Sequence, residues 1–213
     1  MATYESLIKL KGSVGDLVFY TLNGKNVVRK KSGFNKTAYK KNPAYEKVRQ
    51  NSSEFGHCSK VGKMIRSALE EYIRESNDPL LYQKFARLMT QIKDLDTVSA
   101  KGERTVYNGM LTEEGKILLR QFQLGKKSNL EHLSMSMGLW DKSLHLNNIN
   151  ADEISIVTLK VDFEAYTTDH TEQIVPFTGQ TEASFDKQFS DDDFLFYFVA
   201  TKRKGKITAM GFV

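Results

Sequence analysis

The spacing of apolar residues changes twice along this chain of 213 residues, and that change limits its fold class. Residues 5–32 have the composition of strands, residues 43–123 repeat at helical spacing, and residues 154–213 return to a strand pattern. This order predicts an α+β fold with an N-terminal β-hairpin, two to three antiparallel helices and a C-terminal antiparallel β-sandwich or sheet. We expect two domains, a hairpin plus helical region over 1–128 and an antiparallel β domain over 129–213.

The N-terminal hairpin follows from a turn signal between two strand-like segments. Asp16–Thr21 and Lys25–Lys30 are rich in β-branched and aromatic residues. Asn23-Gly24 lies between them and supplies the positive φ angles of a type I′ turn. Because a two-stranded hairpin is marginally stable by itself, it must pack on another element or pair with another chain.

The first helix is expected to begin at Asn42-Pro43 and to run to about Glu75, with a break near residues 51–53 or Gly56. Small residues on its apolar face favour a close crossing with another helix. The residues of that face are Ala44, Val48, Phe55, Cys58, Gly62, Ile65, Leu69 and Tyr72.

Two further helices follow. The second is expected to start at Asn77-Asp78-Pro79, and the third to cover 112–123 with Thr112 as its cap. The apolar face of the second helix consists of Leu81, Phe85, Leu88, Ile92 and Leu95.

The C-terminal third is expected to be all β. The clearest strands cover 154–163, 194–201 and 206–213, and weaker ones cover 143–148, 173–177 and 182–189. Several short strands at this spacing are typical of a small antiparallel sandwich or open sheet.

Composition and motifs exclude several classes of function. No apolar run approaches the length of a membrane span, and the first residues lack the apolar core of a signal peptide, so we expect a cytoplasmic protein or a particle component assembled in the cytoplasm. The single cysteine, Cys58, is expected to be a packed side chain rather than a nucleophile. The stretch from Gly56 to Met64 does not have the spacing of a phosphate-binding loop.

Metal chemistry has no clear signature either. The four histidines have no partner at metal-ligand spacing. Asp191-Asp192-Asp193 lacks the spacing of a calcium-binding loop and is expected to be a solvated turn before a strand. We therefore predict a non-enzymatic protein with no catalytic residue, no metal site and no cofactor, and we identify no small-molecule substrate.

Charge is distributed unevenly along the chain. Residues 1–66 contain fourteen Lys and Arg against four Asp and Glu, a net +10, whereas residues 151–213 contain six against eleven, a net −5. Basic residues interleaved with aromatic ones suit contacts with phosphates and bases, and a basic surface equally suits the acidic surface of another chain. The residues expected to contact a partner or polyanion are Lys25, Arg29, Lys30, Lys31, Phe34, Lys36, Tyr39, Lys40, Lys41 and Arg49.

The first 55 residues also carry a recognisable pattern of turns and strands: Gly12-x-x-Gly15-Asp16-x-Val18-x-Tyr20, then Asn23-Gly24-Lys25-x-Val27-Val28-Arg29, then Asn42-Pro43 with Arg49 and Phe55. This pattern resembles the opening of uncharacterised bacterial protein families. Those families combine a glycine-bracketed N-terminal β-hairpin with a helical segment and a C-terminal β region, and they have no assigned activity. The longer helical middle of this chain departs from them.

Two functions remain open. The first is a structural protein that self-associates into a homo-oligomer through its basic N-terminal hairpin region, such as an assembly component of a phage or mobile element. The alternative is a nucleic-acid-binding module that uses the basic, aromatic-interleaved segment 25–49.

Overall fold

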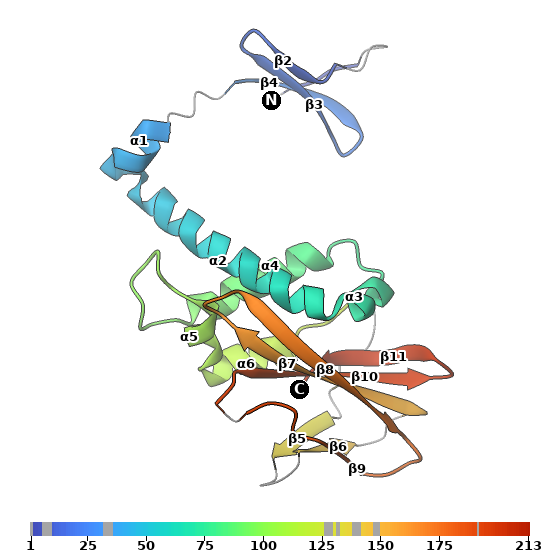
Figure 1. Ribbon diagram of the computed structural model, residues 1–213. Helices are drawn as coiled ribbons and strands as arrows, with labels where there is room; N and C mark the ends of the chain where they lie inside the picture. The colour runs from blue at the N-terminus through green and yellow to red at the C-terminus, as the bar shows by residue number, and fades with distance from the viewer. Residues whose placement is uncertain are drawn as a thin grey trace. The chain divides into compact units, whose positions relative to one another are not determined.

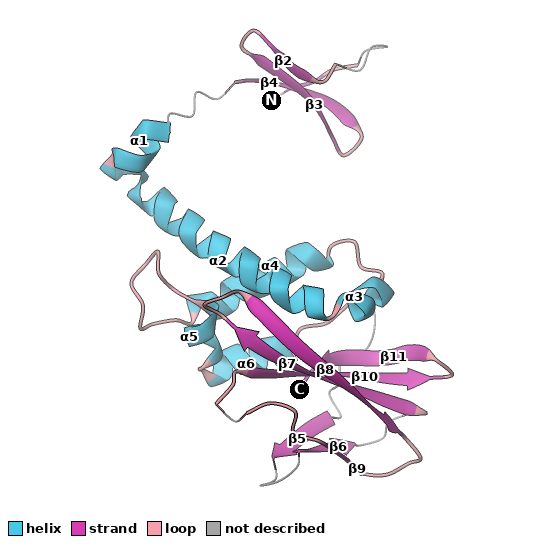
Figure 2. Ribbon diagram, viewed as in Figure 1, coloured by secondary structure: helices cyan, strands magenta, loops and turns pink. Residues whose placement is uncertain are grey.

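The computed structural model describes residues 2–5, 10–31, 36–125, 130, 133–137, 142–146, 150–190 and 192–213. It confirms the α+β class: an N-terminal antiparallel sheet, several helices and C-terminal antiparallel sheets follow one another along the chain (Figures 1 and 2). The chain divides into two compact units, residues 1–46 and 47–213. The domain boundary expected between residues 128 and 129 falls inside the second unit and stays a prediction.

The first unit contains the predicted hairpin. Strands β3 (Leu17–Leu22) and β4 (Lys25–Lys30) pair in antiparallel register through a turn in which Asn23 and Gly24 have φ of 50° and 77°. Strands β1 (Ala2–Thr3) and β2 (Gly12–Val14) extend the hairpin to four strands in the order β1-β4-β3-β2. The hairpin thus finds partner strands within its own unit.

A short helical segment follows the sheet. Helix α1 covers Lys36–Lys41 and the 3₁₀ helix η1 covers Pro43–Tyr45. The Asn42 side chain accepts a hydrogen bond from the N–H of Ala44, which confirms the cap expected at Asn42-Pro43. Among the described residues of this unit, Val27 is the one buried side chain.

The second unit begins within helix α2 (Glu46–Ala68), which is followed by α3 (Glu70–Ser76). The predicted face is confirmed at Cys58 and Ile65 but is wrong at Val48 and Phe55, which are 48% and 62% exposed. It is also wrong at Ala44, which is exposed and precedes α2. The buried face follows Glu54, Cys58, Val61 and Ile65 instead, and Phe55 lies about 100° round the helix from Glu54.

The interruption of the first helix was expected near residues 51–56 but lies at Leu69, where the backbone has φ −113° and ψ 23°. The close helix crossing expected at Gly62 also takes a different form. A Cβ atom at Gly62 would meet side-chain atoms of Met89 and Phe85 at 3.4 and 3.5 Å, so α2 accommodates side chains of the neighbouring helix rather than its backbone.

That neighbour is α4 (Leu81–Asp94), the predicted second helix, which begins after Leu80 rather than at the expected Asn77-Asp78-Pro79. Asn77 instead ends α3. The expected apolar residues of α4 are confirmed as buried at Leu81, Phe85, Leu88 and Ile92, whereas Leu95 is half-buried. The backbone of α5 (Val106–Met110), a helix that the sequence did not indicate, approaches α4 at Gly109.

The third predicted helix is α6 (Glu113–Arg120), one turn shorter than expected. The Thr112 hydroxyl accepts a hydrogen bond from the N–H of Gly115, so the predicted cap is confirmed.

Two antiparallel sheets complete the second unit. The larger contains β7 (Glu153–Asp162), β8 (Thr167–Pro176), β10 (Leu195–Arg203) and β11 (Lys206–Phe212) in the order β11-β10-β7-β8. The smaller contains β5 (Leu133–Met137), β6 (Lys142–Leu146) and β9 (Glu182–Phe185) in the order β5-β6-β9. A strand lies at each of the six expected places, but β8 begins six residues before the expected 173–177 and β9 ends four residues before the expected end at 189. Strand β5 is an additional one.

The central strands β7 and β10 of the larger sheet are buried on both faces. Val157, Leu159 and Phe198 belong to the core shared with the helices, whereas Ile156 and Val199 belong to a second core with the small sheet. The helices and the small sheet lie on opposite sides of this sheet in Figure 2. Double-sided burial explains why residues 194–200 are almost continuously apolar.

Candidate functional site

The register of the first sheet decides which of the predicted basic residues share a face. Residues paired directly across an antiparallel ladder project from the same side, and neighbours along a strand project from opposite sides. Arg29 pairs with Val18 and Lys25 with Leu22, so both cations lie on the face that also carries Tyr20. Lys30 pairs with Leu17 and lies on the opposite face.

The remaining predicted residues lie beyond the sheet. The N–H of Lys31 donates to the carbonyl of Asp16 at 2.6 Å, which closes the end of the hairpin. Helix α1 carries Lys36, Tyr39, Lys40 and Lys41, and Lys40 and Lys41 occupy its last turn, where the helix dipole favours cations.

The other two predicted residues are not among those described on the sheet or on α1. Arg49 lies on α2 in the second unit. Phe34 lies outside the described residues. Of the ten residues, the structure therefore places Lys25 and Arg29 on one sheet face and four others on one short helix.

Sequence reasoning missed the apolar part of this surface. Leu10, Val14, Leu17 and Leu22 are 44%, 65%, 43% and 49% exposed. Val14 pairs with Leu17 on the face that carries Phe19, and Leu22 lies on the opposite face. The signal was present in Leu17-Val-Phe-Tyr-Thr-Leu22, because apolar residues on both faces of a strand are typical of a strand covered on both sides.

One aromatic contact organises part of the apolar face. The Tyr4 ring meets the Phe19 ring edge to face, with centroids 5.7 Å apart. The Tyr4 hydroxyl donates to the carbonyl of Leu10 at 3.2 Å. Even so, Phe19 stays partly exposed, so one aromatic pair does not give this sheet a core.

In the second unit, the densest group of charges surrounds Glu54, which is 3% exposed. Its carboxylate accepts hydrogen bonds from Lys93 Nζ at 2.7 Å, from Arg104 Nε and Nη2 at 2.9 and 2.7 Å, and from the N–H of Gly102 at 2.7 Å. The hydrogen bond from Arg104 is the main reason that the pKa of Glu54 is lowered to about 2. These four hydrogen bonds to the Glu54 carboxylate connect α4 and the loop after it to α2.

Asp96 organises the same loop. Its carboxylate accepts from the N–H groups of Ser99 and Thr105 at 2.9 Å each and from the side-chain amide of Asn108 at 3.0 Å. Burial alone would raise the pKa of Asp96, but these hydrogen bonds outweigh it and hold the pKa well below its usual range. Both buried carboxylates thus have structural partners.

Cys58 is a packed side chain, as the sequence predicted. It is 1% exposed, and its thiol donates to the carbonyl of Met89 at 3.6 Å. Burial raises the pKa of the thiol to about 11, so the nucleophilic thiolate is scarce at neutral pH.

The neighbouring His57 points elsewhere. Its Nε2 accepts from the N–H of Val106 at 2.9 Å, and its Nδ1 lies 2.9 Å from the Tyr166 hydroxyl. Since a backbone N–H can only donate, the proton of the neutral ring lies on Nδ1 and is donated to Tyr166. Burial lowers the pKa of His57, which favours this neutral form.

A search for metal ligands finds no group of three or more His, Cys, Asp or Glu side chains within the described ranges. Of the acidic run before β10, Asp193 forms an ion pair with Lys160 at 2.9 Å, and Asp191 lies outside the described residues. None of the helices in the described part of the chain has the length and apolar character needed to span a bilayer.

Comparison with known proteins gives no relative: no protein-family model, curated protein or solved structure matches the chain. The resemblance noted for the first 55 residues is thus without a matching family model. Any function must be argued from the surfaces described above.

Proposed function

We propose that this protein is a non-enzymatic structural component that self-associates through its N-terminal unit, residues 1–46. The carrying observation is that its four-stranded sheet buries one side chain, Val27, among the described residues while Val14, Leu17 and Leu22 stay exposed. Burying apolar surface contributes roughly 25 cal/mol per Å², and a single layer with one buried side chain gains little of it. Covering this sheet with another chain supplies the missing burial.

Charge supports another copy of the chain as that partner. Residues 1–46 contain nine Lys and Arg against three Asp and Glu, a net +6, whereas residues 151–213 have a net −5. Asp169 and Glu172 are exposed on β8, which lies at one edge of the larger sheet. A contact between unlike surfaces of two copies is heterologous, so it produces rings or open filaments.

Sedimentation velocity at low and high salt tests the proposal. The full chain is expected to form oligomers at micromolar concentration in low salt. The variant Val14→Thr/Leu17→Thr removes apolar surface from one face of the sheet. It should weaken association by about tenfold, since two side chains that become partly buried in the contact between copies contribute on the order of 1.4 kcal/mol to the free energy of association.

A matched control changes Val98 and Leu111 to Thr, because these side chains are 87% and 55% exposed in the second unit. This control should associate like the unmodified chain. A monodisperse monomer of the full chain at micromolar concentration in low salt would rule the proposal out.

A nucleic-acid-binding module is the second candidate, favoured by the single sheet face that carries Lys25, Arg29 and Tyr20. A face with two cations and an aromatic ring suits phosphate contacts with base stacking. Affinity for duplex and single-stranded DNA or RNA should then fall with salt, with a log–log slope of roughly 0.9 per phosphate contact for duplex DNA.

Charge reversal separates this candidate from general basicity. Lys25→Glu/Arg29→Glu should abolish binding, whereas the same change at the exposed Lys101 and Lys206 should leave most of it. The absence of binding at low salt removes this candidate, because non-specific affinity is the least that such a surface provides.

A further inference from the structure

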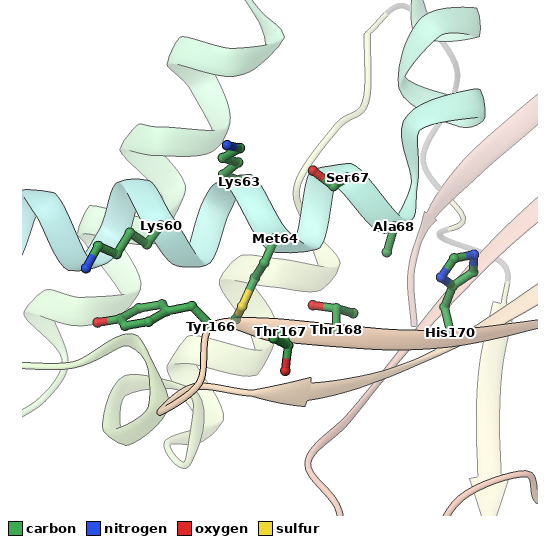
Figure 3. Close-up of a pocket in the computed structure, with 9 residues that line it drawn as sticks. All are labelled: Lys60, Lys63, Met64, Ser67, Ala68, Tyr166, Thr167, Thr168 and His170. Atoms are coloured by element: carbon green, nitrogen blue, oxygen red, sulfur yellow. The ribbon is translucent and has the colours of Figure 1, made fainter.

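A hollow of about 530 Å³ opens between α2 and the start of β8. Lys60, Lys63 and Ser67 line it from α2, and Thr168 and His170 line it from β8. Figure 3 shows Met64 and Ala68 pointing from the helix toward the strand, where they give the hollow an apolar floor. The hollow lies wholly within the second unit, and its β8 residues are neighbours along the strand of Asp169 and Glu172, the acidic residues named for self-association.

The ionisable side chains that line the hollow are mainly basic. The residues that line the hollow in the described part of the chain include two lysines and a histidine but no carboxylate. The second unit as a whole contains 23 Asp and Glu against 22 Lys and Arg, so the lining is more basic than the unit that contains it. Within the described ranges, neither Lys60 nor Lys63 forms an ion pair, and both are exposed.

The strand wall turns polar groups toward the helix, whereas Figure 3 shows Lys63 and Ser67 of α2 pointing away from the strand. Lys60 and Lys63 are three residues apart, so they are neighbours on the surface of α2. Thr168 pairs with Val161 and His170 with Leu159, and both of those β7 residues belong to the core shared with the helices. Thr168 and His170 therefore lie on the side of β8 that faces α2.

Tyr166 holds one end of the hollow rigidly. Its φ of 55° is unusual for a non-glycine residue and is energetically unfavourable. Tyr166 ends the turn between β7 and β8, in which the Asp162 side chain accepts hydrogen bonds from the N–H groups of Glu164 and Ala165. Glycine would adopt the same backbone conformation at this position without strain.

The tyrosine at this position makes contacts that glycine lacks. Its hydroxyl accepts from His57, and Lys60 Nζ lies 4.7 Å from the centre of its ring. The ring thus fixes the lysine beside the hollow, which reduces the entropy that a ligand must remove on binding.

We propose that this hollow binds a small organic anion that carries a phosphate group. Lys60 and Lys63 provide donors for the phosphate, and the apolar floor of Met64 and Ala68 contacts the organic part. His170, at the other end of the hollow in Figure 3, lies on the side of that organic part. A volume of about 530 Å³ lies in the range of small-molecule sites and exceeds the needs of inorganic phosphate alone.

Isothermal titration of the full chain with AMP tests this proposal, with adenosine and inorganic phosphate as separate probes. AMP should bind more tightly than either probe. Lys60→Gln/Lys63→Gln should weaken AMP binding by at least about tenfold, since hydrogen bonds from a charged donor to phosphate are stronger than those from a neutral donor. His170→Gln should weaken it by a smaller factor.

The matched control is Lys101→Gln/Lys206→Gln, which removes the same charge from exposed positions outside the hollow and should leave AMP binding unchanged. Equal losses in both double variants would overturn the proposal, as would equal affinity for AMP and adenosine. If a single-stranded oligonucleotide binds these lysines and AMP does not, the hollow is part of a polyanion surface and the proposal is wrong.

Discussion

At the scale of single residues, Glu54 is the position where burial and charge oppose each other most directly. Its carboxylate is almost fully buried and depends on Lys93, Arg104 and the N–H of Gly102. Glu54→Gln keeps the shape but leaves Lys93, itself 4% exposed, without its buried counter-charge. We expect this variant to lose about 3 kcal/mol in the free energy of unfolding, measured by chemical denaturation.

Asp94 provides the control for that measurement. It contacts the same cations, at 2.6 Å from Lys93 and 3.0 Å from Arg104, but its side chain is 52% exposed. Asp94→Asn should therefore cost less than about 1 kcal/mol. Similar losses in the two variants would show that burial of the Glu54 carboxylate is not what makes it important.

The same carboxylate predicts how stability depends on pH. The pKa of Glu54 is about 2 in the folded chain, below its ordinary value of 4.5, so its stabilising contribution is complete above about pH 4.5 and is lost as the pH falls toward 2. The lowered pKa of Asp96 acts in the same direction. The free energy of unfolding should thus decrease between pH 5 and pH 2, and this decrease should be smaller in Glu54→Gln. An equal decrease in both proteins contradicts the assignment.

At the scale of helices, two glycines have opposite roles. A Cβ atom at Gly109 of α5 would lie 1.9 Å from the carbonyl oxygen of Ile92 in α4, so Gly109→Ala must push the two helices apart. At Gly56, inside α2, a Cβ atom would meet nothing within 4 Å. Gly56→Ala should raise the free energy of unfolding by about 0.5–1 kcal/mol, whereas Gly109→Ala should lower it by about 2–4 kcal/mol.

Thermal unfolding of the two alanine variants checks this pair. Because the substitution is identical, helix propensity favours alanine at both positions, and packing alone produces the opposite signs. Stabilisation by both variants would mean that α5 does not pack against α4 as described.

At the scale of the whole molecule, the described cores of the second unit include no residue from 1–46. The fragment 47–213 should therefore keep the near-ultraviolet circular dichroism of its packed aromatic residues and unfold cooperatively. If the N-terminal unit carries the self-association, this fragment should sediment as a monomer under conditions in which the full chain forms oligomers. Oligomers of the fragment equal to those of the full chain would place the contact in the second unit.

The sequence by itself determined the features that depend on neighbouring residues. The turn at Asn23-Gly24, the cap at Thr112 and the buried stripe from Leu81 to Ile92 each follow from interactions within a few positions, and each is confirmed. The basic character of the N-terminal segment was equally visible. The apolar residues on both faces of its strands were visible too, but their exposure was not, because exposure depends on what covers a strand rather than on the strand itself.

Only the tertiary structure decided which distant residues meet. Glu54 reaches Lys93 and Arg104, 39 and 50 residues further along the chain, and His57 reaches Tyr166 after 109 residues. The pairing of β8 with β7 and the position of α2 bring Lys60 and His170 to one hollow. Apolar spacing specifies which side of an element is buried but not which partner buries it, since burial of apolar surface is non-directional. The partners are selected by the packing of the whole chain.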